Sequence, residues 1–114
     1  MSRDRPNLLA MLDAIARISE YTRGIASPET FSAESIVFDA TLMNFVVIGE
    51  MADRLSRDLK ARHDEVDWQK IKDFRNIVAH DYMGVDAEEV WQILTGDLSV
   101  LEMQLREMVA SLPD

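Results

Sequence analysis

The segment TLMNFVVIGEMA, residues 41–52, decides the fold of this chain because it is apolar on nearly every side of a helix. A helix of that kind is buried on more than one side. In a chain of 114 residues the pattern indicates either the central helix of a bundle or a surface that packs against a second copy. Gly49 lies inside this helix at a cost of about 1 kcal/mol relative to alanine, so we expect another backbone to approach closely there.

The remaining segments predict further helices. An amphipathic helix is expected from about residue 5 to 23, and the helix around the apolar segment is expected from about 32 to 62. A short helix capped by Asp67 follows, and a last helix begins at Asp86. Its apolar side chains alternate spacings of three and four, as in antiparallel bundles: Trp91, Leu94, Leu98, Leu101, Leu105, Met108 and Leu112. The chain is therefore predicted to be all-α, an up-and-down bundle forming one domain over residues 1–114.

The net charge of −9 argues against a broad affinity for nucleic acid, which comes mainly from Lys and Arg that neutralise phosphates. The charge is uneven, however, because residues 53–75 sum to +1 and the rest of the chain sums to −10. This basic stretch is either a solvated helix face beside an acidic body or a rim that attracts phosphate. No aromatic platform for single-stranded bases is evident in the sequence.

Several classes of site are disfavoured by composition. The chain has no cysteine, so it has no disulfide and no thiolate metal site. The acids around Asp64 lack the spacing of a metal site, and the four dispersed glycines do not form a phosphate loop. The first residues do not resemble a signal peptide, and no apolar run approaches the roughly 20 residues of a membrane span. We therefore expect a cytoplasmic protein without membrane contact, metal or cofactor.

The run RNIVAHDY, residues 75–82, holds the residues best suited to catalysis. Arg75 is a permanent cation shaped for phosphate, and His80 can take and give a proton near neutral pH. On a straight helix their side chains would point about 140° apart, whereas Arg75 and Tyr82 would share a face. We therefore expect residues 78–85 to leave the helix and to bend His80 and Tyr82 toward Arg75.

Structural roles are the alternative for each of these residues. His80 could cap a helix end or be partly buried, and Arg75 could simply pair with Asp73 or Asp81. Tyr82 could be a core aromatic with its hydroxyl at the rim.

The motif and its surroundings resemble the HepT-like branch of the HEPN superfamily. The resemblance rests on FRNIVAHDY at residues 74–82, VIGEMA at 47–52, WQKI at 68–71 and VWQIL at 90–94, and it covers most of residues 8–110. Met51 departs from the alanine that is usual in this branch. The resemblance implies a bundle of four to five helices that forms a two-fold homodimer, with two motifs facing a shared cleft.

It also implies a metal-independent endoribonuclease, the toxin of a type VII-like toxin–antitoxin pair. The 2′-hydroxyl of RNA would be the nucleophile, and the products would carry a 2′,3′-cyclic phosphate and a 5′-hydroxyl. His80 would act as general base or acid, Arg75 would stabilise the transition state, and Asn76 would orient one of them.

The resemblance further implies a partner, a minimal nucleotidyltransferase antitoxin that moves AMP from ATP to Tyr82. ATP would then be the partner's substrate and not a cofactor of this chain. Two other functions remain open. One is a non-catalytic helical dimer that binds such a nucleotidyltransferase, and the other is a nucleotide-binding bundle that acts on a small molecule.

Overall fold

The computed structural model describes residues 3–113, and every regular element among them is helical. This confirms the all-α prediction. A one-turn 3-10 helix is labelled η1, and a π-helical turn is labelled η2. The elements are α1 (Asp4–Tyr21), α2 (Pro28–Ala33), α3 (Ser35–Asp53), α4 (Arg57–Arg62), α5 (Trp68–His80), η1 (Tyr82–Gly84), α6 (Ala87–Gln92), η2 (Ile93–Asp97) and α7 (Leu98–Ser111).

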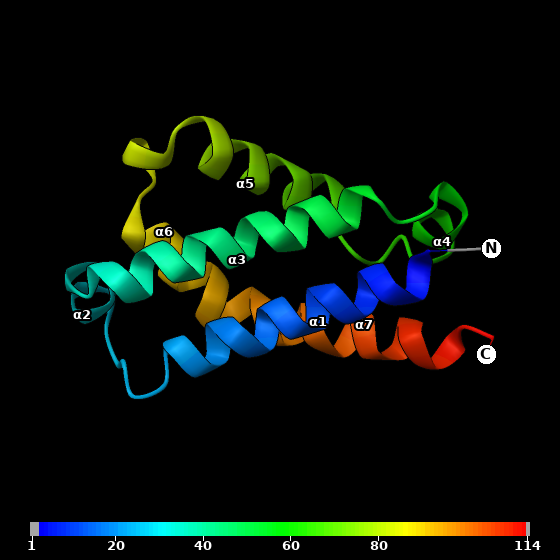
Figure 1. Cartoon of the computed structure of the whole chain (residues 1–114), viewed down its shortest axis with the longest axis horizontal. Coiled ribbons are helices and arrows are strands. Elements are labelled where there is room, and N and C mark those ends of the chain that lie inside the picture. The colour runs from blue at the N-terminus through cyan, green and yellow to red at the C-terminus, as the bar shows by residue number, and fades with distance from the viewer. Residues whose placement is uncertain (1–2, 114) are drawn as a thin grey trace.

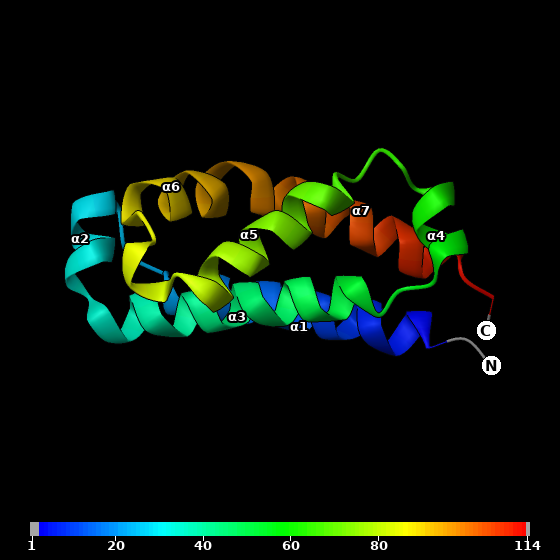
Figure 2. The same ribbon diagram turned by 90° about the horizontal axis from the view of Figure 1, so that it is seen from above.

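The long helices form a bundle around α3, which packs against α1 on one side and against α5 on the other (Figure 1). Figure 2 shows α5 running obliquely between α3 on one side and the α6–α7 rod on the other. The predicted apolar segment is therefore the central helix of the bundle. The core is built from apolar side chains at helical spacings, among them Leu8, Met11, Ile15, Ile18, Leu42, Phe45, Ile48, Leu98, Leu105 and Met108. Burial of each such side chain contributes about 1.5–3 kcal/mol to folding.

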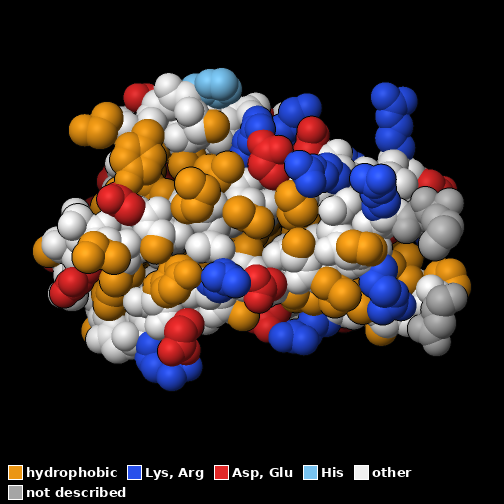
Figure 3. All heavy atoms as spheres, viewed as in Figure 1, with side chains coloured by type: hydrophobic (Ala, Val, Ile, Leu, Met, Phe, Trp, Pro, Cys, Tyr) orange, Lys and Arg blue, Asp and Glu red, His pale blue; other side chains and the backbone are white. Residues whose placement is uncertain are grey.

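One side of α3 still faces solvent. Ile36 is 83% exposed and Met43 is 62% exposed, while Ile77 of α5 and Met83 of η1 are 49% and 92% exposed. Figure 3 shows apolar side chains spread across this face of the molecule. Among the described residues, α3 is also the one helix that is long and apolar enough to cross a membrane by length and composition. Its packing between α1 and α5 explains much of that composition.

The helix predicted over residues 32–62 was wrong, because the chain breaks there twice and forms α2, α3 and α4. The first break is at Glu34, whose ψ of 79° is not helical. At the second break, the Ser56 N–H and hydroxyl donate to the two carboxylate oxygens of Asp4 at 2.8 and 2.7 Å. The Ser56 hydroxyl in turn accepts from the Leu59 N–H at 3.1 Å and caps α4. A contact with the first turn of α1 therefore ends the long helix.

Other predicted ends are close to those observed. Asp67 caps α5 by accepting from the Lys70 N–H at 3.0 Å, and Asp86 caps α6 by accepting from the Glu88 N–H at 3.0 Å. The last predicted helix is present as α6, η2 and α7, and the π turn that contains Gly96 interrupts its regular spacing. The seam still faces inward, because each of its members is buried or partly buried.

Replacing Asp4 by alanine should lower the free energy of unfolding by about 2 kcal/mol, because a buried carboxylate that accepts two hydrogen bonds is lost. Asp13→Ala is the matched control on the same helix. It removes only a surface pair with Arg17, so the expected loss is below about 0.5 kcal/mol. Urea unfolding of both variants would check this, and equal losses would contradict the capping role of Asp4.

Candidate active site

α5 approaches α3 closely at Gly49. A Cβ at this position would overlap the Cβ and Cγ atoms of Arg75, so no other residue fits without moving α5. The sequence predicted a close approach at Gly49, and this is confirmed. The neighbour is the aliphatic stem of Arg75, however, and not another backbone. The glycine therefore sets where Arg75 lies.

The guanidinium of Arg75 is held between the two helices. Its Nη2 donates to the Glu50 carboxylate on α3, and its Nη1 donates to Asn76 Oδ1 at 2.8 Å. Its Nε is buried without an acceptor among residues 3–113. The alternative of a pairing with Asp73 or Asp81 is wrong, because Glu50 is the ion-pair partner of Arg75. The arrangement leaves a cation that is oriented but still about one-third exposed.

His80 lies at the exposed last position of α5. The chain was expected to leave the helix from residue 78, but it stays helical through His80 and departs at Asp81, where φ is −140° and ψ is 53°. The reason is Val78, which is 3% exposed and anchors the last turn of α5 in the core. Helix geometry therefore directs Arg75 and His80 about 140° apart, and the predicted bend of His80 toward Arg75 is wrong. The alternative of a partly buried His80 is wrong as well, because His80 is exposed.

Tyr82 projects from η1 toward α3 and not toward Arg75. Its hydroxyl donates to Asp39 Oδ1. This hydrogen bond, with smaller effects from desolvation and from the carboxylate charge, raises the pKa of Tyr82 above its ordinary value. The ring is 41% exposed, so Tyr82 is not a core aromatic. A Cβ at Gly84 would overlap the Asp81 carboxylate, which would have to shift.

Two acids on α3 complete the site, and their roles were not predicted. Asp39 holds Tyr82, and Glu50 holds Arg75. They are eleven residues apart, close to three full turns, so they lie on one side of α3. That spacing of two carboxylates along an apolar helix was the signal that could have found them. The site is thus a strip along the α3–α5 contact, with acids on α3 and the motif on α5 and η1.

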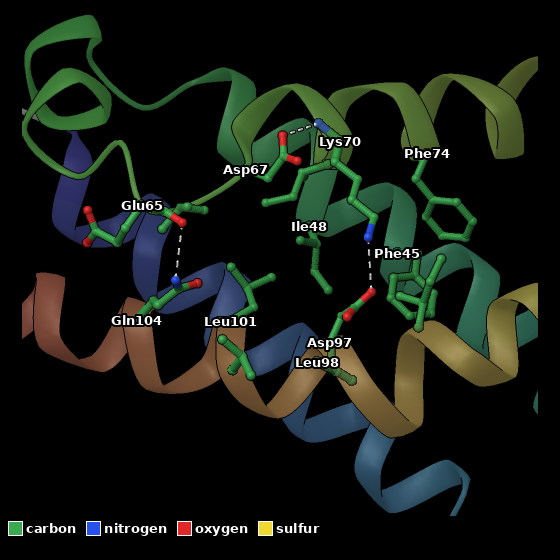
Figure 4. Close-up of a pocket in the computed structure, with 14 residues that line it drawn as sticks. Phe45, Ile48, Glu65, Asp67, Lys70, Phe74, Asp97, Leu98, Leu101 and Gln104 are labelled. Atoms are coloured by element: carbon green, nitrogen blue, oxygen red, sulfur yellow. Dashed lines mark hydrogen bonds and ion pairs between the residues drawn. The ribbon is translucent and has the colours of Figure 1, made fainter.

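A hollow with a volume of about 280 Å³ lies away from this strip, between α3, α5 and the η2–α7 segment (Figure 4). Its walls are mainly apolar, and Lys70 bridges its rim to Asp97 at 3.3 Å. None of Arg75, His80 and Tyr82 lines it. Over residues 3–113, no three His, Asp or Glu side chains come together in a way that could hold a metal ion.

The fold and the site together define a class of protein. It is a small all-α bundle whose surface site has an arginine and a histidine on α5 and a tyrosine in the following turn. The sequence model of the family described as "Ribonuclease HepT-like" matches residues 11–108, so the chain belongs to this family. The resemblance found from the motif is thereby confirmed.

Curated relatives carry matching descriptions. "Putative RNase TTE0752" of Caldanaerobacter subterraneus subsp. tengcongensis is 28% identical over 96% of this chain and 96% of its own length. "Putative RNase MJ1380" of Methanocaldococcus jannaschii is 24% identical over 86% of this chain and 89% of its own length. "Gamma-glutamylcyclotransferase and putative RNase MJ0434" of the same organism is 24% identical over 90% of this chain but only 46% of its own length. No solved structure matches this chain.

Replacing Gly49 by alanine should lower the free energy of unfolding by about 1–3 kcal/mol, because the new methyl group forces α5 away from α3. Gly96→Ala is the control, since nothing lies within 4 Å of a Cβ built there. That change should be neutral or stabilising by up to about 1 kcal/mol, because alanine favours helix. Thermal and urea unfolding would measure both, and equal effects would argue against the close contact.

Proposed function

We propose that this protein is a metal-independent endoribonuclease and the toxin of a type VII-like toxin–antitoxin pair in the cytoplasm. The observation that carries the proposal is the RNIVAHDY run, residues 75–82, whose His80 and Tyr82 are exposed, in a member of the HepT-like ribonuclease family. Its arginine is oriented by neighbours on two helices, and its histidine is free to reach solvent. These are the two groups that phosphodiester chemistry without a metal requires.

The 2′-hydroxyl of RNA attacks the adjacent phosphorus. The bond from phosphorus to O2′ forms, and the bond from phosphorus to O5′ breaks. This leaves a 2′,3′-cyclic phosphate on one product and a 5′-hydroxyl on the other. His80 takes the proton from the 2′-hydroxyl or gives one to the departing O5′. Arg75 stabilises the negative charge that builds up on the phosphorane-like transition state. Asn76 keeps the guanidinium in place through its 2.8 Å hydrogen bond.

A two-fold dimer supplies the second histidine. Within one chain, helix geometry directs Arg75 and His80 about 140° apart, so a single copy does not aim both at one phosphate from the same side. A second copy across a two-fold axis brings its own His80, so that one histidine acts as base and the other as acid. The exposed Ile36, Met43 and Met83 on α3 and η1 provide apolar surface for that contact.

Tyr82 is the proposed point of control by a minimal nucleotidyltransferase antitoxin. The phenol oxygen attacks the α-phosphorus of ATP, an O–P bond forms, and pyrophosphate leaves. Asp39 already accepts the hydrogen bond of this hydroxyl and is placed to take its proton. The added AMP brings bulk and negative charge to the strip that holds Arg75 and His80, so it competes with RNA phosphate.

A second candidate function is a non-catalytic helical dimer whose task is to bind the nucleotidyltransferase. The net charge of −9 and the exposed apolar side chains of α3 favour it. Dependence of RNA cleavage on His80 separates the two candidates.

His80→Ala should reduce cleavage of total cellular RNA by about 100-fold or more, because the proton-transfer group is lost. The assay is run in chelator with analysis of product end groups. His63→Ala, which changes the other histidine of the chain, should cleave as the parent does and yield the same cyclic-phosphate ends. A fully active His80→Ala variant would contradict the mechanism. If the folded parent and both variants fail to cleave RNA, the result would favour the non-catalytic dimer.

Tyr82→Phe should escape neutralisation by the nucleotidyltransferase and ATP, whereas Tyr21→Phe should be neutralised like the parent. Mass spectrometry should find one added AMP on the parent and on Tyr21→Phe, and none on Tyr82→Phe. Full neutralisation of Tyr82→Phe would mean that the partner inhibits by binding alone.

A further inference from the structure

A small polar hollow adjoins the candidate active site and is called here the Lys72 pocket. It has a volume of about 220 Å³ and lies where α3, α4 and α5 meet. Its lining residues are Gly49, Ala52, Asp53, Lys60, Trp68, Gln69 and Lys72. Gly49 forms part of its wall and also contacts the stem of Arg75, so the pocket lies next to the strip that holds Arg75. The volume is below the roughly 300–1,000 Å³ of typical small-molecule sites, so it can enclose only part of a ligand, such as the phosphate or the base of one nucleotide.

The charges of the Lys72 pocket suit a phosphate. Lys72 precedes Arg75 by three residues, so the two cations are neighbours on α5. Lys72 is exposed, and among residues 3–113 no carboxylate forms an ion pair with it. The Lys60 ammonium donates to the Ala52 carbonyl at 3.2 Å, which fixes it at the pocket and leaves two of its three donors for a ligand. Asp53 is the single acid of the lining, so the pocket is positive in an acidic chain.

Figure 3 shows Lys and Arg side chains gathered over the N-terminal half of α5. This is the part of the chain where the sequence allowed either a solvated face or a phosphate-attracting rim. The position of the pocket next to Gly49, which also contacts Arg75, favours a rim that attracts phosphate.

Trp68 supplies an aromatic surface in the same pocket. Its indole N–H donates to the His63 carbonyl at 3.1 Å, so the ring is fixed although it remains partly exposed. A fixed aromatic ring beside lysines is how many proteins hold single-stranded nucleic acid, because every base can stack and every nucleotide carries a phosphate. Trp68 and Lys72 are four residues apart and therefore lie on the same side of α5 as neighbours.

We propose that the Lys72 pocket holds the nucleotide next to the cleaved phosphate, with Lys72 and Lys60 on its phosphate and Trp68 against its base. The inference rests on the proposed ribonuclease function. It assigns an RNA strand that runs along α5, from Trp68 through Lys72 to Arg75. Lys72, Lys60 and Trp68 are positioning residues, because they hold the strand while Arg75 and His80 act at the reacting phosphate.

Binding is measured by fluorescence anisotropy with a short 2′-O-methyl oligonucleotide, which lacks the nucleophile and stays intact. Lys72→Gln should weaken binding about threefold or more and should reduce the slope of log affinity against log salt by about 0.7, because one phosphate contact is lost. Lys70→Gln is the matched control, two residues away on the same helix and paired with Asp97 at the other hollow. It should leave both the affinity and the slope unchanged.

Equal weakening by the two lysine variants, or no weakening by Lys72→Gln, would overturn the pocket assignment. Trp91→Phe leaves Trp68 as the sole tryptophan, and its fluorescence should be quenched when the oligonucleotide binds. Absence of quenching would overturn the stacking role. Because the oligonucleotide is not cleaved, these results stand apart from the His80→Ala cleavage assay. Lysine-dependent binding without any RNA cleavage would contradict the proposed ribonuclease function but would still support the Lys72 pocket as an RNA-binding site.

Discussion

The contact between Gly49 and the stem of Arg75 is the constraint on which the rest of the site depends. It allows α5 to lie so close to α3 that there is no room for even one methyl group between them. At that distance the guanidinium reaches Glu50, one residue further along α3. Glycine at position 49 lowers the intrinsic stability of α3. It also lets α5 lie close enough for Glu50 to hold the guanidinium of Arg75.

Much of the fold could be predicted because helical periodicity is a local property of the sequence. The stripe of α1, the cap at Asp67 and the inward seam of α6–α7 all follow from spacing within one segment. The division of residues 32–62 could not be predicted in this way. Its second break depends on Asp4, which is 52 residues from Ser56 in the chain and meets it only after α1 has packed on α3.

For the candidate site, too, the sequence predicted what depends on neighbouring residues and missed what depends on packing between helices. Residue type and spacing were enough to select Arg75, His80 and Tyr82. The spacing of Asp39 and Glu50 places the two acids on one side of α3, but which motif residue each acid holds depends on how α5 crosses α3. The prediction that His80 bends toward Arg75 was wrong because it rested only on the side chains that would converge. It left out Val78, whose burial keeps the last turn of α5 helical.

The helix that carries the site has fewer fully buried side chains than α1, α3 or α7. Val78 is the one fully buried side chain of α5, and the hollow of about 280 Å³ separates it from α7. Helices held by few buried contacts open at a lower free energy than the core around them. The residues of the candidate site thus lie on an element that can open locally without unfolding of the remainder of the bundle.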